Sequence, residues 1–173
     1  MELVFALVSI GQTFAVSLGV GSSTLAILNF FAAIADGTID ETERRMMGVV
    51  YVVLRVAMVA ILLLTLLRIA LSGAPLTTLD TFTYGFLTIV GVLYLNAILM
   101  TRHLIPNTIG PAAQAGSWYA LGLLTALVPV GFTHFSYGQF LLGYAAVLLL
   151  AVAVVNATME WMKREAHQRE SGE

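Results

Sequence analysis

Long apolar stretches separated by short polar connections make up most of this chain. Five stretches are long enough for a membrane helix, which needs about 20 apolar residues to cross the hydrocarbon, and none alternates as a membrane β-strand does. The connections carry turn residues and helix breakers. The pattern predicts an all-α integral membrane bundle of five helices, with one transmembrane domain at 1–162 and a short charged cytoplasmic tail at 163–173. The five spans are expected at 3–35, 47–71, 82–100, 112–132 and 137–161.

Basic residues are placed unevenly between these stretches. They follow the first, third and fifth stretches, whereas the connections after the second and fourth contain no Lys or Arg. The positive-inside rule therefore predicts an N-terminus outside and a C-terminus in the cytoplasm. The first stretch lacks a basic flank and a cleavage site of the signal-peptide type, so we expect it to be a retained helix. We expect a multi-pass protein of a bacterial or archaeal inner membrane. The basic residues that set this orientation are Arg44, Arg45, Arg102, Lys163 and Arg164.

Composition supports a membrane protein and excludes several other classes. The chain is 59% hydrophobic and 10% charged, against about 25% charged in an average soluble domain. The net charge of −2 and the lack of a basic tract argue against a nucleic-acid partner. With no cysteine, the chain has no disulfide and no thiolate metal ligand. The lipid bilayer is the expected partner.

The first stretch is longer than a membrane requires. Its 33 residues make about 50 Å of helix, against about 30 Å of hydrocarbon, so it must tilt, protrude or break. The expected break is Leu18-Gly19-Val20-Gly21-Ser22-Ser23-Thr24. This segment can be an unwound ligand site, as in transporters. It can also be a packing face, which we favour, because small residues recur every four positions. We therefore assign a packing or gating role to Gly19, Gly21, Ser22 and Ser23.

Four polar residues lie inside four different apolar stretches. Asn29, Arg55, Asn96 and Asn156 each lie about two to three helical turns from the charged end of their stretch. An unpaired arginine within a membrane costs at least about 2.5–3.5 kcal/mol by insertion scales. We therefore expect the four side chains to meet in a polar layer near the cytoplasmic side.

Further polar residues belong to the same predicted layer. Tyr51 lies one turn before Arg55 on the same helix face, and Glu160 and Asp36 are expected counter-charges. The layer has two interpretations: it binds an anion, an ion or a lipid group, or it ties the helices together, as interhelical polar contacts ordinarily do. The leading functional hypothesis is binding or permeation of such a ligand. The alternatives are a haem- or metal-linked redox protein and an accessory subunit whose small-residue face contacts a partner subunit or a second copy.

The segment from 36 to 43 resembles the second half of a calcium-binding loop. The first two ligand positions would be Ala32 and Ile34, whose side chains cannot bind calcium. Helix capping explains the segment better. Gly37 is expected to end the first helix, and Asp40 with Glu43 is expected to form a capping box for the second.

The remaining titratable residues predict no confident site. His103, His134 and His167 are scattered and lie outside the middle of every span, so no metal or haem site is predicted from them. Arg68 and Asp80 are expected to pair on the outer side, where an exposed pair contributes little.

Several motifs resemble a group of small bacterial membrane proteins. They are Gly19-Val20-Gly21-Ser22-Ser23, the segment 36–46 and the segment 102–106 with Asn96. The chain resembles uncharacterised five-helix proteins related to CopD-like copper-resistance domains, and Glu43-Arg44-Arg45-Met46 is similar to the membrane protoporphyrinogen oxidase family. That family implies haem-linked chemistry through a first-helix histidine and a third-helix lysine. Here the first helix offers Gln12 and the third has no lysine, so no catalytic residue is transferred and the cofactor remains unknown.

Overall fold

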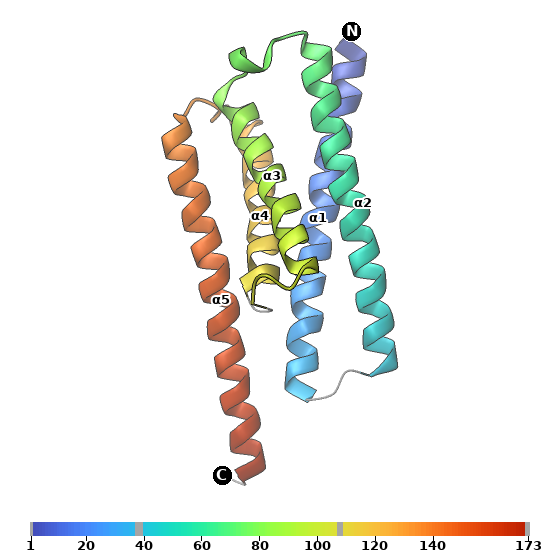
Figure 1. Cartoon of the computed structure of the whole chain (residues 1–173), viewed down its shortest axis with the longest axis vertical. Coiled ribbons are helices and arrows are strands. Elements are labelled where there is room, and N and C mark those ends of the chain that lie inside the picture. The colour runs from blue at the N-terminus through green and yellow to red at the C-terminus, as the bar shows by residue number, and fades with distance from the viewer. Residues whose placement is uncertain (1, 37–39, 107–108, 172–173) are drawn as a thin grey trace.

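The computed structural model describes residues 2–36, 40–106 and 109–171. These residues form helices connected by short loops, which confirms the all-α prediction. Successive long helices run in opposite directions, and the two ends of the chain lie at opposite ends of the molecule (Figure 1). The elements are α1 (Glu2–Asp36), α2 (Glu41–Ser72), the 3₁₀ turn η1 (Leu76–Thr78), α3 (Thr81–Thr101), α4 (Ile109–Leu127) and α5 (Tyr137–Ser171).

Four of these helices are long and apolar enough to cross a membrane. They are α1 over 2–32, α2, α3, and α5 over 137–162. The fourth predicted span, which became α4, is not among them: it has 19 residues and includes Gln114, Ser117 and several small residues. Four apolar spans still fit a multi-pass membrane protein.

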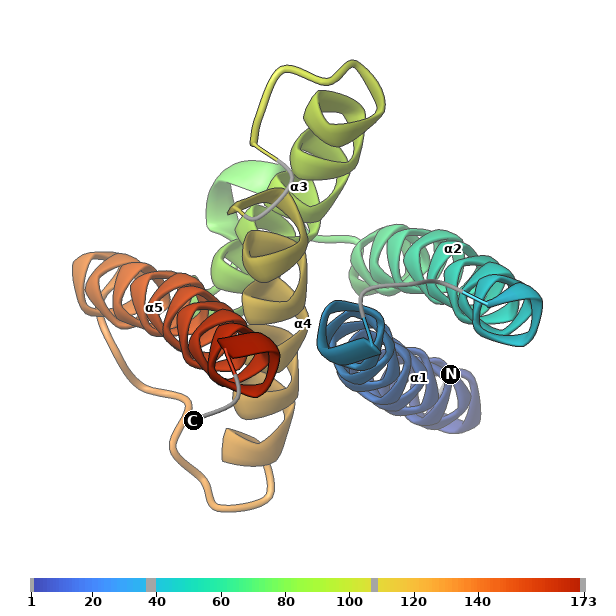
Figure 2. The same cartoon turned by 90° about the horizontal axis from the view of Figure 1, so that it is seen from below.

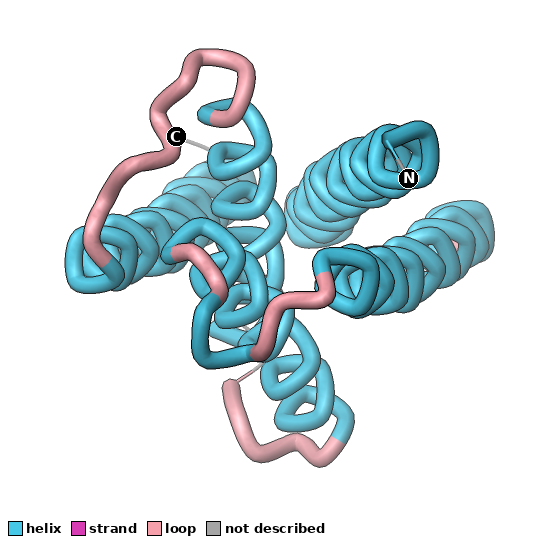
Figure 3. Tube along the Cα trace, turned by 90° about the horizontal axis from the view of Figure 1, so that it is seen from above, coloured by secondary structure: helices cyan, strands magenta, loops and turns pink. Residues whose placement is uncertain are grey.

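The less apolar composition of α4 follows from its position. α4 lies between α1, α3 and α5 (Figure 2). Its Trp118, Leu121 and Ser117 side chains are fully buried. Because other helices rather than lipid cover most of α4, it does not need the continuous apolar surface of its neighbours. The α1–α2 pair stands beside the other three helices (Figure 3).

The helix α1 is continuous, so the break expected at 18–24 does not occur. Glycine weakens a helix by only about 0.5–1 kcal/mol, and the packing of Gly19 against α4 offsets this cost. The excess length appears instead as overhang. α1, α2 and α5 have 32 to 35 residues, or about 48–52 Å. They extend past the connection between α3 and α4 (Figure 1). The predicted tail is part of this overhang, since α5 continues to Ser171.

The helix ends follow local capping chemistry. Asp40 Oδ1 accepts a hydrogen bond from the Glu43 amide at 2.6 Å, and Glu43 Oε2 accepts one from the Asp40 amide at 3.1 Å, which confirms the capping box. Gly37, the predicted end of the first helix, lies outside the described residues.

α4 ends at Leu127 rather than at the predicted residue 132. Pro129 disfavours helix at the residue before it and lacks an amide donor.

Candidate functional site

The four polar residues predicted to meet lie on four different helices and have different surroundings in the structure. Asn96 is buried on α3. Its Nδ2 donates to the Gly110 carbonyl at 2.9 Å and to Gln114 Oε1 at 2.8 Å, both on α4. Both bonds join α3 to α4, so they favour the bundle-tying interpretation for this residue.

The other two asparagines make no such contact. Asn29 on α1 and Asn156 on α5 are half-buried, and neither forms a hydrogen bond with any residue that the structure describes. In the described parts of the chain, no hydrogen bond joins the four side chains that the sequence predicts to form a single layer. Similar depth on different helices does not bring side chains together, because helix rotation is set by packing against neighbours.

The expected charge partners also differ. Glu160 lies 4.0 Å from Arg164 on its own helix, with both side chains largely exposed, and not beside Arg55. The Asp36 side chain lies outside what the structure describes. Arg68 Nη1 donates to Gln12 Oε1 at 3.3 Å, and Gln12 Nε2 donates to Thr65 Oγ1 at 3.2 Å. In the described parts of the chain, Arg68 therefore bonds to the side-chain amide of Gln12 on α1 and forms no ion pair with Asp80.

Arg55 lies in an open groove between α2 and α3, which we call the α2–α3 groove. The groove has a volume of about 530 Å³. Arg55 itself is exposed, so its guanidinium is not part of the buried core. The lining residues are Arg55, Met58, Val59, Tyr94, Ala97, Ile98, Thr101 and Arg102.

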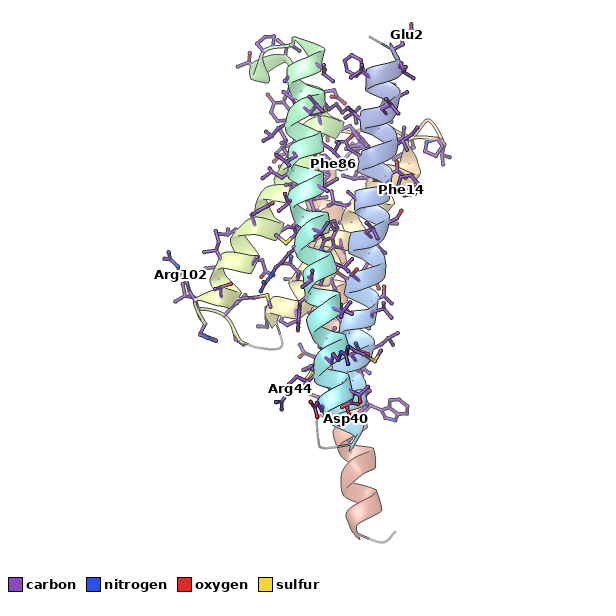
Figure 4. The ribbon with its side chains drawn as sticks, turned by 90° about the vertical axis from the view of Figure 1, so that its right-hand side faces the viewer. Glu2, Phe14, Asp40, Arg44, Phe86 and Arg102 are labelled. Atoms are coloured by element: carbon purple, nitrogen blue, oxygen red, sulfur yellow. The ribbon has the colours of Figure 1, made fainter. Side chains whose placement is uncertain are left out.

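The groove exists because α3 diverges from α2. Viewed from the side, α3 leans away from the α1–α2 pair and carries Arg102 outward at its end (Figure 4). Where the helices approach, Tyr94 Oη donates to the Met58 carbonyl oxygen at 3.0 Å. The two helices are thus joined at this point and separate towards Arg102.

The chemistry of the groove is cationic and otherwise mostly apolar. Arg55 and Arg102 line it, no acidic residue does, and Val59 and Ile98 expose about half of their surface. Neither arginine forms a hydrogen bond or ion pair through its side chain with any residue in the described parts of the chain. The guanidinium group is a planar donor fork that fits phosphate and carboxylate oxygens. The groove can therefore bind an anion that also carries apolar groups.

Tyr51, predicted to share the face of Arg55, does not line this groove. It lines a separate inner cavity together with Ser23. Sequence reasoning used Arg102 only for orientation and did not single out Gln114. Both residues could have been found from the sequence, because Arg102 directly ends an apolar stretch and Gln114 is a lone amide among alanines.

The small-residue segment of α1 divides into packed and open positions. Gly19 is buried, and a methyl group there would overlap the Trp118 ring of α4. Ser22 and Ser23 are also buried. Gly21 is exposed, and a methyl group added there would meet no other atom within 4 Å. The packing interpretation thus fits Gly19 and not Gly21.

Comparisons with known proteins add no further assignment. No family model, curated protein or solved structure matches the chain. Among the residues that the structure describes, no three His, Cys, Asp or Glu side chains group as metal ligands do. The α2–α3 groove is therefore the candidate site on its own geometry.

Proposed function

We propose that this protein is a multi-pass inner-membrane protein with its C-terminus in the cytoplasm, and that it binds a phosphate-bearing lipid in the α2–α3 groove. One observation carries the proposal: Arg55 and Arg102, from two different helices, line one groove whose other walls are mostly apolar. The lipid phosphate would accept hydrogen bonds from the guanidinium groups, and the acyl chains would cover Val59 and Ile98.

The energetics of a membrane favour this ligand. Arginine at the depth of an apolar span is costly unless an anion or water reaches it. Phospholipids supply an anion at the membrane surface, and an arginine side chain is long enough to extend towards it. The α3–α4 connection lies short of the ends of α1, α2 and α5 (Figure 1). A headgroup can therefore descend beside the end of α3 to the level of Arg102.

The position of the groove favours a lipid over a free anion. It opens on the outside of the bundle between two helices, where acyl chains are the surrounding solvent. An inorganic ion would leave the exposed apolar walls of the groove uncovered. The phosphate of a double-chained lipid can bind the two arginines while its acyl chains cover the apolar walls.

Lipid binding by the full-length protein in detergent tests the proposal, with native mass spectrometry as the readout. Phosphatidylglycerol should bind more tightly than phosphatidylcholine. Arg55→Ala and Arg102→Ala should each weaken phosphatidylglycerol binding about tenfold, because a hydrogen bond to a charged group contributes about 1.5–3 kcal/mol.

Arg44→Ala is the matched control, because Arg44 is an exposed α2 arginine outside the groove. Its phosphatidylglycerol affinity should equal that of the unmodified protein. Equal affinity in the Arg55 and Arg44 variants would refute the proposal. Competition by inorganic phosphate at the same concentration as lipid would instead identify a free-anion site.

A further inference from the structure

A second, smaller space lies inside the bundle, and we call it the inner cavity. Its volume is about 80 Å³, and residues of all five helices, α1 to α5, line it. It is adjacent to the α2–α3 groove but distinct from it, since Leu54 faces the cavity and Arg55 the groove. Its lining is Ser23, Ala26, Ile27, Phe30, Tyr51, Leu54, Met100, Pro111, Ala112, Gln114, Ala115 and Val155.

Ser23 is the informative residue of this cavity. It is 3% exposed, and its hydroxyl has no hydrogen-bond partner among the described residues. Other helical hydroxyls nearby are paired: Thr24 donates to the Val20 carbonyl at 2.8 Å and pairs with Tyr119 Oη at 2.7 Å. A buried hydroxyl without a partner costs about 1–3 kcal/mol, so the cavity is expected to supply one.

Gln114 provides a second polar group on the opposite wall. Its Oε1 accepts from Asn96 at 2.8 Å. Its Nε2 donates only to the weak sulfur acceptor of Met58, at 3.5 Å. An amide nitrogen carries two hydrogens, so at least one N–H remains to be satisfied from the cavity.

The two ends of the cavity have different surroundings. Trp118 lies one turn beyond Gln114 on α4 and packs against Gly19, which lies one turn from Ser23 on α1. This contact closes the cavity on the side away from the α1–α2 loop. Towards that loop the lining continues with Phe30 and Tyr51, and Tyr51 is 51% exposed.

We propose that the inner cavity is a water-filled pocket that opens at the α1–α2 loop end of the bundle, with Ser23 and Gln114 binding the water. A water needs about 10–15 Å³ of such volume and two to four polar partners. The cavity is therefore large enough for several waters, and Ser23, Gln114 and Tyr51 are the polar side chains in its otherwise apolar lining. This inference is independent of lipid binding in the groove.

The absence of cysteine from the chain makes the pocket directly testable. Ser23→Cys introduces a single thiol of nearly the same size. A small, charged methanethiosulfonate reagent reacts only with a hydrated thiol, and it would be added to membrane vesicles from either side. Ser23→Cys should react at least about tenfold faster than a dry buried thiol, because apolar burial raises a thiol pKa and each unit lowers the thiolate fraction tenfold.

Three reference variants define the result. Ala15→Cys is a buried position on the same helix that lies outside the cavity, and Leu25→Cys is an exposed position of the apolar surface; both should stay unreacted. Glu41→Cys, at the exposed start of α2, identifies the side that bears the α1–α2 loop. Ser23→Cys should react from that same side.

Two outcomes would overturn the inference. One is a Ser23→Cys reaction no faster than that of Ala15→Cys. The other is reaction only from the side opposite to Glu41→Cys. If Ser23→Cys fails to fold, Ala26→Cys replaces it, because Ala26 lines the same cavity, and the same two outcomes apply.

Discussion

The α1–α4 contact and the α2–α3 groove are two helix pairs built in opposite ways. In the first, Gly19 lets the Trp118 ring lie against the α1 backbone, Val20 lies against Gly122, and Thr24 pairs with Tyr119. In the second, larger side chains and a diverging α3 leave an open space with Arg55 exposed in it.

The difference shows where polar residues serve the fold and where they are available to a ligand. At closely packed pairs, the polar side chains bond across the interface, as Asn96 does with α4. At the diverging pair, two arginines face an open groove and find no partner among the described residues. Small residues close the α1–α4 interface, whereas the divergence of α3 from α2 leaves room for a ligand.

The largest effect on stability is expected from a substitution in the closely packed α1–α4 contact. Gly19→Ala places a methyl group against the atoms of the Trp118 ring, and the ring is fully buried. We expect a loss of at least about 2–3 kcal/mol in the free energy of unfolding, the upper range for overpacking a core. Unfolding in mixed micelles, followed by circular dichroism, measures this loss.

Gly21→Ala is the matched control two residues away. Nothing lies within 4 Å of the added methyl group, and alanine favours a helix over glycine by about 0.5–1 kcal/mol. The free energy of unfolding should stay constant or rise slightly. Equal losses in the two variants would show that the α1–α4 contact is not as close as described.

The next largest effect on stability is expected from removing the hydrogen bonds between α3 and α4. Asn96→Ala removes the two hydrogen bonds to α4 and takes the Asn96 donor away from the side-chain oxygen of Gln114. We expect a loss of about 1–2 kcal/mol, in the range measured for interhelical hydrogen bonds and for groups left unsatisfied. Asn156→Ala, at a half-buried position without such bonds to described residues, should change the free energy of unfolding by less than about 0.5 kcal/mol. The same loss in both variants would contradict the different hydrogen bonding of Asn96 and Asn156.

The sequence was a good guide to the helices and a poor guide to their mutual rotation. Apolar length predicted five helices, and the pattern of Asp40 and Glu43 predicted the capping box, because both depend on residues close along the chain. The packing role of Gly19 also followed from its four-residue spacing. The end of α4 was misplaced by an apolar stretch that continued past Pro129.

The candidate site depended on information that the apolar pattern lacks. Asn29, Arg55, Asn96 and Asn156 have similar depths, but the face that each presents is set by tilt and rotation. Arg102 joins Arg55 only because α3 leans outward and ends at that level (Figure 4). A tilt of this kind follows from packing between helices distant along the chain, and no local pattern encodes it.

A smaller effect is expected where the diverging helices are joined. Tyr94→Phe removes only the hydroxyl that donates to the Met58 carbonyl. The expected loss is about 0.5–1 kcal/mol, the net contribution of one ordinary hydrogen bond, and phosphatidylglycerol affinity should change less than in the Arg55 variant. A tenfold loss of lipid affinity in Tyr94→Phe would move the ligand contact from the arginines to this tyrosine.

The smallest effect on stability is expected at Arg55, and it separates the two interpretations of the polar residues. Arg55 is exposed, and in the described parts of the chain its side chain has no hydrogen-bond or ion-pair partner. Arg55→Leu should therefore leave the free energy of unfolding unchanged within about 0.5 kcal/mol, or raise it, since an apolar side chain suits a lipid-facing position. A loss as large as that of Asn96→Ala would mean that Arg55 ties the bundle together. An unchanged free energy of unfolding combined with weakened lipid binding would show that Arg55 serves ligand binding, because the variant would then lose affinity without losing stability.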